Sequence, residues 1–344
     1  MKTIFRIFTI ISFLIIALIA TFGYKVFFKS NTSFSEDFVY IYVNSGSSKD
    51  EMISSISSYI IDVESFIKAA KTKKYLENIK AGRFIIYKGD GNNNIINSLR
   101  SKNIPLNITF NNIQTIQEFS GYISKKIEAD SMSLMESFTD KNFLKSLNLS
   151  QESVLSLFLP NTYEFFWNTS ADNFREKMVR EFNNFWNENR IEKANKIGLN
   201  PVEVSVLASI VQKETPKVDE RPTIAGVYLN RLSKRMKLQA DPTIVYVIKR
   251  KEGFDEKIRR VLYKDLRIKS AYNTYLNKGL PPGPIVTPDF SAIEAVLNPS
   301  SHNFIFFVAD VSNPGYHLFS RTLVEHNRKK RQYTKWLKEN RIKR

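Results

Sequence analysis

Residues 200–216 read NPVEVSVLASIVQKETP, a stretch with the start and stop signals of one complete helix. Asn200 is a good N-cap, the proline after it suits the first helical position, and Glu203 can complete a capping box. Pro216 ends the pattern, because the residue before a proline is pushed out of helical geometry. The stretch therefore predicts a helix with Glu214 at its end.

Glu214 is the one carboxylate at the end of this predicted helix. The positions on its face, three, four and seven residues earlier, hold Val211, Ile210 and Leu207. A carboxylate against apolar side chains tends to a raised pKa, so Glu214 can hold a proton near neutral pH and act as a general acid. The alternative, which position alone favours, is a side chain that turns outward into solvent.

Composition sets the size of the protein and excludes several chemistries. The chain has 344 residues, 42% of them hydrophobic, enough for two or three domains with cores. Without cysteine it has no disulfides, Fe–S clusters or thiolate sites, which is compatible with an oxidising compartment. Its three histidines lack metal-ligand spacing, and the glycine-rich phosphate-binding motifs and GxSxG are missing. We therefore expect no metal, no nucleotide and no other cofactor.

The formal net charge of +17 is compatible with an acidic polymer, anionic lipid or nucleic acid as partner. The basic residues are not spaced as in a basic-region helix or a base-stacking RNA motif, so we expect no nucleic-acid partner. A basic face that meets only water is the commoner alternative.

The N-terminus carries an apolar run from Ile7 to Tyr24, about 18 residues without a charge, which is near the minimum for crossing a bilayer. A cleaved signal peptide would have a shorter apolar core and a small-x-small exit, and Ala17 and Ala20 are spaced wrongly for one. We therefore predict an uncleaved, single-pass membrane anchor within residues 1–30. Both flanks are basic, so charge says little about its orientation.

Residues 31–125 contain a repeat. IYVNSG at 41–46 and FIIYKG at 84–89 are 43 positions apart, and the apolar positions that follow each keep the same offset. Each copy predicts a strand, a glycine turn and a short amphipathic helix, and a weaker third copy spans 106–123. We expect small α+β modules that can be removed without unfolding residues 126–344.

The remainder of the chain mixes helices with short strands, which is typical of an α+β fold. The patterns predict a turn rich in aromatic residues at 158–165, a long helix at 173–197, a basic connector or surface helix at 251–270, short strands at 304–309 and 317–319, and a basic helix over 325–344.

Five further motifs follow the predicted helix: GVYLNRL at 226–232, LQADPT at 238–243, AYNTY at 271–275, GLPPG at 279–283 and LNP at 297–299. Together with IVQKET at 210–215, they resemble the YceG-like family, the endolytic murein transglycosylases. The resemblance covers most of residues 36–335. The combination is highly specific, although no single piece is.

The resemblance implies a layout: an anchor at 1–30, a LysM-like βαα-type subdomain at 31–125, a mixed α/β catalytic domain at 126–335 and a basic tail at 336–344. It implies peptidoglycan glycan strands as substrate and peptidoglycan synthases as candidate partners. The protein would sit in the inner, cytoplasmic membrane with its catalytic domain on the extracytoplasmic, periplasmic side. There it would terminate glycan elongation.

The resemblance also points to the catalytic acid. Family members often carry Glu at the position of Gln212; that carboxylate is missing here, which leaves Glu214 as the candidate. Thr215 after it is similar to the Glu-Ser pair of other lytic transglycosylases. Glu214 would protonate the oxygen between N-acetylmuramic acid and N-acetylglucosamine. It would then accept a proton from the C6 hydroxyl that attacks C1, which leaves a 1,6-anhydro end. One carboxyl serves both steps, whereas ordinary glycosidases use two.

Three other carboxylates compete with Glu214. Asp241 precedes a proline and is as readily a turn or helix-capping residue as a ligand group. Glu220 stands beside Arg221, which suggests an ion pair that orients the site. Glu164 lies next to aromatic residues and is an outside candidate.

Neutral hydrogen-bonding side chains and aromatic faces suit sugar hydroxyls, N-acetyl amides and sugar rings. Besides Glu220 and Asp241, the candidates for substrate binding are Asn230, Gln239, Tyr272, Asn273, Tyr163 and Tyr228. Each has a structural alternative, because most polar side chains bond to backbone or water.

Two functions fit these observations. The first is a membrane-anchored, glycan-cleaving enzyme. The second is a catalytically weak, peptidoglycan-binding scaffold of the wall-synthesis machinery, in which the LysM-like modules bind the glycan. The intact pair of Glu214 and Thr215 favours the enzyme.

The apolar N-terminal segment is expected to stay attached to the mature protein, because it is long and has no small-x-small exit. N-terminal sequencing of the protein purified from membranes checks this. A mature terminus near Lys25 would contradict the anchor.

Overall fold

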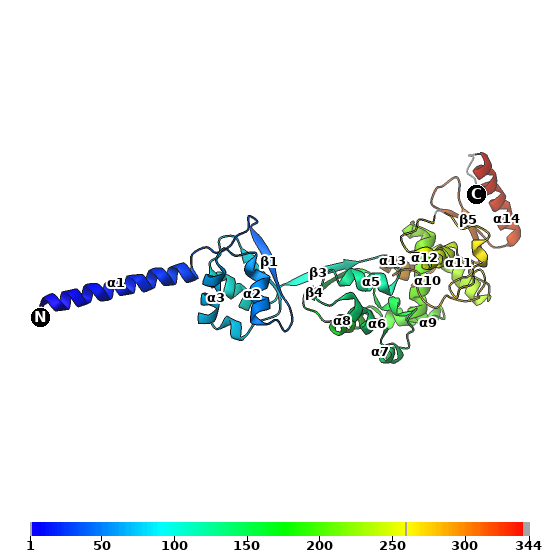
Figure 1. Ribbon diagram of the computed structural model, residues 1–344. Helices are drawn as coiled ribbons and strands as arrows, with labels where there is room; N and C mark the ends of the chain where they lie inside the picture. The colour runs from blue at the N-terminus through cyan, green and yellow to red at the C-terminus, as the bar shows by residue number, and fades with distance from the viewer. Residues whose placement is uncertain (1, 259, 340–344) are drawn as a thin grey trace. The chain divides into compact units, whose positions relative to one another are not determined.

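The computed structural model describes residues 2–258 and 260–339, which pack as two compact units (Figure 1). The N-terminal unit comprises residues 2–108, 125–129 and 163–170; the C-terminal unit comprises 109–124, 130–162 and the described residues from 171 onward. The domain limits expected at 31–125 and 126–335 stay a prediction.

The N-terminal unit is built on a two-stranded antiparallel sheet. Its elements after the first helix are β1 (Phe38–Val43), α2 (Lys49–Ser57), α3 (Val63–Thr72), η1 (Tyr75–Glu77), β2 (Gly82–Tyr87) and α4 (Asn92–Arg100). Phe38 lies opposite Tyr87 and Val43 opposite Gly82. The strand–turn–helix prediction is confirmed for both copies of the repeat.

The two copies are not independent modules, because β1 of the first copy pairs with β2 of the second. A lone strand leaves its backbone groups unpaired, so each copy needs the strand of the other. Their helices cover one shared core, which includes Ile41, Ile56, Phe84 and Leu99, all fully buried. A LysM-like identity for this subdomain stays a prediction.

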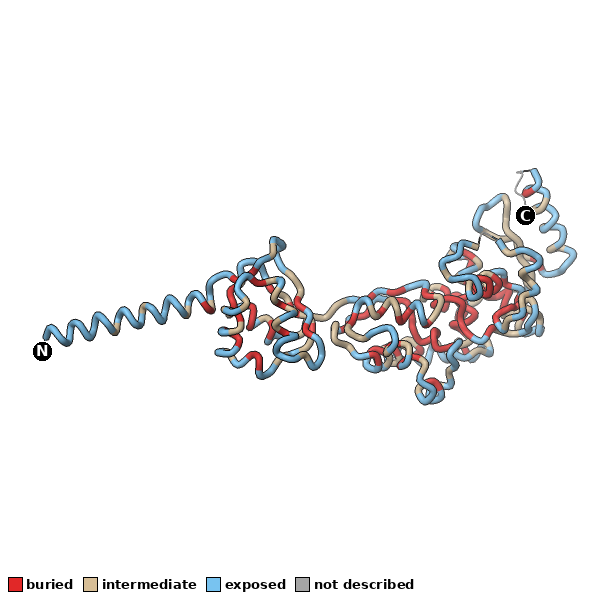
Figure 2. The backbone as a smooth tube through the Cα atoms, in the orientation of Figure 1, coloured by how far each residue is buried: buried red, intermediate tan, exposed pale blue. Residues whose placement is uncertain are grey.

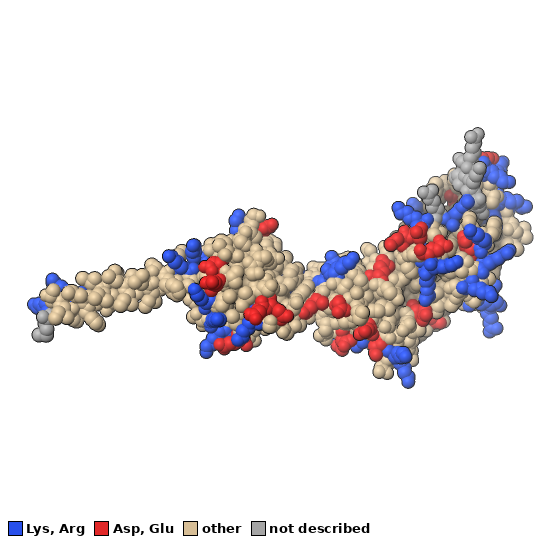
Figure 3. All heavy atoms as spheres, viewed as in Figure 1, with Lys and Arg blue, Asp and Glu red and all other residues tan. Residues whose placement is uncertain are grey.

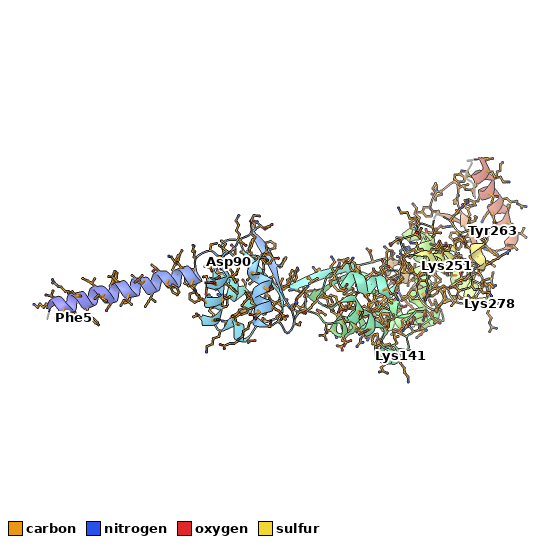
Figure 4. All side chains as sticks on the ribbon, in the orientation of Figure 1. Phe5, Asp90, Lys141, Lys251, Tyr263 and Lys278 are labelled. Carbon is orange, nitrogen blue, oxygen red and sulfur yellow. The ribbon has the colours of Figure 1, made fainter. Side chains whose placement is uncertain are left out.

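The first helix, α1 (Lys2–Phe27), is long and apolar enough to cross a membrane, with a mean hydropathy of 2.5 over an 18-residue window. Figure 2 shows it exposed along nearly its whole length, and Phe5, labelled in Figure 4, is 75% exposed. Its last turn is different: Val26 is buried, and its carbonyl accepts a hydrogen bond of 2.8 Å from the Asn92 amide. Gly91 lies so close to the Phe27 and Phe28 carbonyls that a Cβ there would collide with them.

The third copy of the repeat forms its elements but pairs elsewhere. Its strand β3 (Pro105–Phe110) lies beside β4 (Asn161–Phe166) in a separate two-stranded sheet, and its helix is α5 (Ile116–Ile123). The turn expected at 158–165 is therefore wrong from residue 161 onward. Alternate residues of β4, Tyr163 and Phe165, are buried, which is the period of a strand with one covered face.

The C-terminal unit is mainly helical. Its elements after α5 are α6 (Ser131–Thr139), α7 (Lys141–Ser146), η2 (Val154–Leu157), α8 (Ala171–Phe185), α9 (Glu188–Lys196), α10 (Pro201–Glu214), η3 (Val218–Glu220), α11 (Arg221–Ser233), α12 (Asp241–Glu252), η4 (Asp265–Arg267), α13 (Phe290–Leu297), β5 (Phe306–Ala309), β6 (His317–Ser320) and α14 (Leu323–Glu339). The two predicted strands near residues 304 and 317 are confirmed as β5 and β6, which pair antiparallel.

The prediction of one long helix at 173–197 is wrong, because the helical conformation is interrupted between the end of α8 and the start of α9. The Asn187 side chain accepts a hydrogen bond from the Arg190 N–H at 3.1 Å and so caps a new helix. The predicted basic segment at 251–270 is mostly irregular, since α12 ends at Glu252 and Gly253 follows with φ 122°. The basic C-terminal helix is confirmed through Glu339; residues 340–344 of the expected tail lie outside the described residues.

Helix α10 is the centre of the C-terminal unit. It begins and ends as predicted, with the Asn200–Glu203 capping box in place and Thr215 as C-cap. All eight residues from Val204 to Val211 are buried, so every side of the helix is covered in its middle. It packs against α9, α11, α12 and α13. Figure 2 shows this part of the chain as a continuous run of buried backbone.

A cluster of aromatic rings packs beside α5. Phe119 is fully buried, with its ring centroid 5.7 Å from Phe138, 4.4 Å from Phe158 and 5.9 Å from Phe174. Since Phe119 precedes residue 126, its position argues against the expectation that residues 126–344 fold without the segment before them.

Replacing Phe119 with Ala should destabilise the C-terminal unit by about 3–5 kcal/mol, because a buried ring is lost and a cavity remains. Chemical denaturation of the full chain measures the effect. Met132→Ala, a change at a 71%-exposed position of α6, is the control and should leave stability nearly unchanged. Equal effects of the two changes would contradict a core role for Phe119.

Candidate active site

Glu214 lies at the last residue of α10, where the buried helix emerges at a cavity. Its side chain is partly exposed, whereas Ile210 and Val211 before it are fully buried. Thr215 next to it is buried, and its hydroxyl accepts a hydrogen bond from the Lys217 N–H at 3.1 Å. The helix end is thus fixed on both sides of the carboxylate.

The cavity at Glu214 has a volume of about 1050 Å³. Its lining includes the end of α10, the start of α12, residues 260–263, strand β5 and one face of α14, and single residues such as Tyr275 come from other segments of the C-terminal unit. Tyr263, labelled in Figure 4, belongs to the third of these. The lining mixes apolar rings and aliphatic side chains with a few charged groups, which is typical of a binding site.

Tyr228 of α11 donates a hydrogen bond from its hydroxyl to Glu214 Oε1. Its ring is buried and lies edge-on to Phe307 at 5.9 Å. The pKa of Glu214 is raised to about 7, mainly by burial. The nearby Asp241 charge also raises this pKa, while the Tyr228 hydrogen bond and the Arg231 charge lower it. Glu214 therefore exchanges a proton near neutral pH.

Asp241 begins α12 and lies in the same cavity as Glu214. Its Oδ1 accepts a hydrogen bond from the Tyr275 hydroxyl. The N-cap of α12 is Ala240, so Asp241 is not the capping residue. Tyr275 is an additional site residue; it is the last residue of the AYNTY motif, and its hydroxyl is the feature of the sequence that marks it.

Arg231 is a buried cation behind the site. Its Nε donates to the Ile305 carbonyl at 2.6 Å and its Nη1 to the Leu238 carbonyl at 2.5 Å. Both bonds go to backbone, so the guanidinium keeps a fixed position while its charge favours the ionised form of Glu214. No sequence pattern marks this role of Arg231, because its partners are backbone carbonyls and one of them, that of Ile305, comes from a distant segment.

Gln212 does not line the cavity, and its side chain instead links segments of the C-terminal unit. Its amide donates to Asn112 Oδ1 at 2.9 Å, and its carbonyl oxygen accepts from the Asp289 N–H at 2.6 Å. A glutamate here would keep an acceptor for Asp289 but lose the donor to Asn112. In this chain the position thus joins three segments through a neutral side chain.

Two of the predicted sugar-binding residues hydrogen-bond to backbone carbonyls through their side chains. The Asn230 amide donates to the His302 and Phe304 carbonyls, at 2.8 and 3.0 Å. The fully buried Asn273 donates to the Leu266 and Ile268 carbonyls, at 3.1 and 2.7 Å.

Tyr272 is buried with its ring 4.8 Å from Tyr246. Gln239 is exposed, with φ 49° and its N–H bonded to the Thr274 carbonyl. Neither Tyr272 nor Gln239 lines the cavity at Glu214. The buried ring of Tyr228 likewise has no face free for a sugar, and its hydroxyl acts on Glu214 instead.

Glu220 does not pair with its neighbour Arg221. The buried Glu220 carboxylate accepts from the His317 N–H at 2.6 Å and lies 2.9 Å from His317 Nδ1. Arg221 instead binds Asp289 through Nη1, at 2.8 and 3.0 Å. Each of the two charges thus ties a helix start to a distant segment: Glu220 to β6 and Arg221 to the N-cap of α13.

Two further candidates belong to the N-terminal unit. Tyr163 is buried in β4, and Glu164 next to it is exposed. The residues that the structure brings together at the cavity in the C-terminal unit are Glu214, Asp241, Tyr275 and, through its hydroxyl, Tyr228.

This arrangement can carry out acid–base chemistry with one carboxyl group. Glu214 titrates near neutral pH and is held by a neutral phenol, so it can give a proton and take one back. The tyrosine hydroxyls on Glu214 and Asp241 orient both carboxylates towards the same cavity.

Comparison with known proteins gives a consistent picture. A model of the YceG-like family matches residues 41–332. An endolytic murein transglycosylase of Bacillus subtilis is 31% identical over 323 residues, covering 87% of this chain and 86% of the relative. One of Streptococcus pneumoniae is 37% identical over 126 residues, which is 37% of this chain but 22% of that protein. The crystal structure of a YceG-like protein from Listeria monocytogenes matches 86% of this chain and 99% of its own, with a TM-score of 0.56 and 25% identity.

The raised pKa of Glu214 makes stability depend on pH. The folded-state pKa of about 7 lies above the ordinary value of 4.5, so the protonated carboxyl is the form that folding favours. This stabilisation is fully present below pH 4.5 and is lost as pH rises through 7. At pH 8, Glu214→Gln should therefore be more stable than the wild type by about 1–3 kcal/mol, and the gap should close towards pH 4.5. Thermal or chemical denaturation across pH measures it; a gap that does not change with pH would contradict the raised pKa.

Proposed function

The chain belongs to the YceG-like family, and we propose that it is a membrane-anchored endolytic lytic transglycosylase of peptidoglycan. It cleaves the β-1,4 bond between N-acetylmuramic acid and N-acetylglucosamine and leaves a 1,6-anhydro end. By cutting nascent strands it terminates glycan elongation. The names of the relatives, endolytic murein transglycosylases, support the substrate and the reaction class.

The observation that carries this proposal is the Glu214 carboxyl at the cavity, with its pKa raised to about 7 by burial. An efficient acid–base catalyst needs a pKa near the working pH, so that it can both donate and accept a proton. An exposed glutamate at its ordinary pKa would be almost fully ionised at neutral pH and would be a poor acid.

The reaction uses Glu214 twice. First its proton goes to the glycosidic oxygen, and the bond from that oxygen to C1 of the muramic sugar breaks. The C6 hydroxyl of the same sugar then attacks C1, and its proton goes to the Glu214 carboxylate, which restores the acid. No water is consumed, and one carboxyl is enough, in contrast to the two of ordinary glycosidases.

Tyr228 and Asp241 have opposite effects on the pKa of Glu214, and both effects serve this proton cycle. The Tyr228 hydroxyl donates to Glu214 and stabilises the ionised form that exists between the two steps. The Asp241 charge disfavours that form and so returns the proton to Glu214. Asp241 is itself held by Tyr275. As a second carboxylate in the cavity, Asp241 could instead serve a hydrolytic reaction, which the product analysis below distinguishes.

The anchor proposal rests on α1. A helix of 26 residues is about 39 Å long, which exceeds the roughly 30 Å of a bilayer core. Its last turn packs into the N-terminal unit through Val26 and Asn92, so removal of the helix near Lys25 would cut into a folded subdomain. Because peptidoglycan lies outside the cytoplasm, the rest of the chain belongs on the extracytoplasmic side of the membrane.

The alternative is a scaffold that binds glycan and cleaves it weakly or not at all. The N-terminal unit favours it in one respect, because that unit is a separate compact body without a part in the Glu214 cavity. Under either function, peptidoglycan synthases are the expected protein partners.

Glu214→Gln should abolish glycan cleavage while the protein stays folded. The change keeps the shape of the side chain and removes its proton, and loss of general acid–base catalysis costs on the order of 10²–10⁴-fold or more when one group serves both steps. Cleavage of purified peptidoglycan, followed by mass spectrometry of the products, measures it. Wild-type products should carry 1,6-anhydro ends, about 18 Da lighter than reducing ends because no water is added.

Glu164→Gln and Glu220→Gln are the matched controls and should cost less. Undiminished cleavage by Glu214→Gln would remove Glu214 from the mechanism. Reducing ends in place of anhydro ends would make the protein a hydrolase. Glycan binding without cleavage by the wild type would favour the scaffold.

A further inference from the structure

One face of α14 lines the cavity that holds Glu214. His326, Lys330, Tyr333 and Leu337 are spaced by four, three and four residues, which places them on one side of a helix. The helix is held in this orientation by Lys329 on another side, whose amine donates to the Phe319 carbonyl and pairs with Glu325 at 2.8 Å. The basic C-terminal helix therefore presents a selected set of side chains to the cavity.

The cavity is lined by three cations. Lys330 comes from α14, Lys213 from the end of α10 beside the catalytic carboxyl, and Arg260 from the segment after α12. Figure 3 shows Lys and Arg gathered on the part of the C-terminal unit around α14. Among the described residues, no carboxylate forms an ion pair with Lys213 or Lys330.

The local environment of these cations suits an incoming anion. Burial and the nearby Lys249 charge lower the pKa of Lys213, and the Glu118 charge raises it in part, so an incoming anion would add to a compensation that is incomplete. The cavity carboxylates Glu214 and Asp241 are already engaged by tyrosine hydroxyls. His326, stacked 5.2 Å from Phe306, has a buried Nδ1 without a hydrogen-bond partner in the described part of the chain. The α14 wall thus presents the positive charge of Lys330 to the cavity, while the unpaired ring nitrogen of His326 lies buried behind it.

We propose that this basic wall, made of Lys213, Arg260 and Lys330, binds the carboxylates of the peptide carried by the muramic sugar, so that the enzyme selects peptide-bearing glycan. The proposal rests on the function proposed above. The peptide hangs from the same sugar whose C1 reacts, so its carboxylates are the anions that accompany every scissile bond. A phosphate at the end of a lipid-linked strand would accompany only one. Amines and guanidinium groups form their strongest hydrogen bonds with such ionised acceptors.

The test compares three polymers cleaved by the full-length protein in detergent. The first is uncrosslinked glycan with its peptides, the second is the same glycan with its peptide carboxylates converted to methylamides, and the third is glycan stripped of peptides. The wild type should show a kcat/KM for the first about threefold to tenfold above the other two, the range expected for one or two partly exposed charged contacts. Raising the salt concentration should reduce this preference, because screening weakens it.

Lys213→Gln and Lys330→Gln should lower the preference towards one, and Lys330→Arg should restore it, because it keeps the charge. Lys335→Gln is the control: this lysine is on α14 but 78% exposed, and it does not line the cavity. The ratio between polymers is the readout, so a general loss of activity next to Glu214 does not imitate the effect. Thermal denaturation confirms that each variant is folded.

Equal cleavage of all three polymers, or an unchanged ratio in the lysine variants, would overturn the proposal. If the cleavage preference depends only on a lipid-linked phosphate at the strand end, the proposal for peptide carboxylates is wrong and the phosphate is the anion that the basic wall binds. Binding of the Glu214→Gln protein to the same polymers separates this proposal from the proposed function. Preferential binding of peptide-bearing glycan without wild-type cleavage would support peptide binding by the basic wall and contradict the proposed enzymatic function. Cleavage without a preference for peptide-bearing glycan would support the enzymatic function and contradict peptide binding by the basic wall.

Discussion

The burial of α10 is the constraint on which the C-terminal unit depends. Its middle is covered on all sides by α9, α11, α12 and α13, so the helix can neither rotate nor slide without breaking several interfaces. The capping box at Asn200 fixes where it starts, and Thr215 fixes where it ends. The carboxylate of Glu214 is therefore delivered to one point at the cavity by a fully packed element, as a functional group on a rigid scaffold requires.

The environment of Glu214 balances opposing effects. Burial and Asp241 favour the protonated carboxyl, while Tyr228 and Arg231 favour the ionised one. Burial alone would leave an acid that releases its proton reluctantly, and the donor and cation alone would leave a permanent carboxylate. The balance brings the pKa to about 7, where both forms are available for a two-step proton cycle. Arg231 can hold its place because its own hydrogen bonds go to backbone carbonyls, independently of the substrate.

The polar residues around the site divide into those that face the cavity and those that shape it. Asn230 and Gln212 bond to distant segments, and Asn273 bonds to the loop just before it, so the three side chains fix loops around the site. Gly283 has a related role, because a Cβ there would collide with the Glu152 carbonyl. A substitution at these positions would act on the shape of the cavity, whereas one at Glu214 or Asp241 would act on its charge.

The sequence by itself determined the local features of this protein. It placed the ends of α10, the apolar stripe below Glu214, the strand and helix of each repeat and the apolar N-terminal segment, because caps, prolines and periodicity act over a few residues. Tertiary structure alone decided the partners. It paired β1 with β2 and ended one expected helix before Asn187. It also paired Arg221 with Asp289 and Glu220 with His317. Finally, it placed the Tyr228 hydroxyl at Glu214 and the Tyr275 hydroxyl at Asp241. These contacts join positions far apart in the chain, and no local pattern specifies which of several polar groups will meet once the helices are packed.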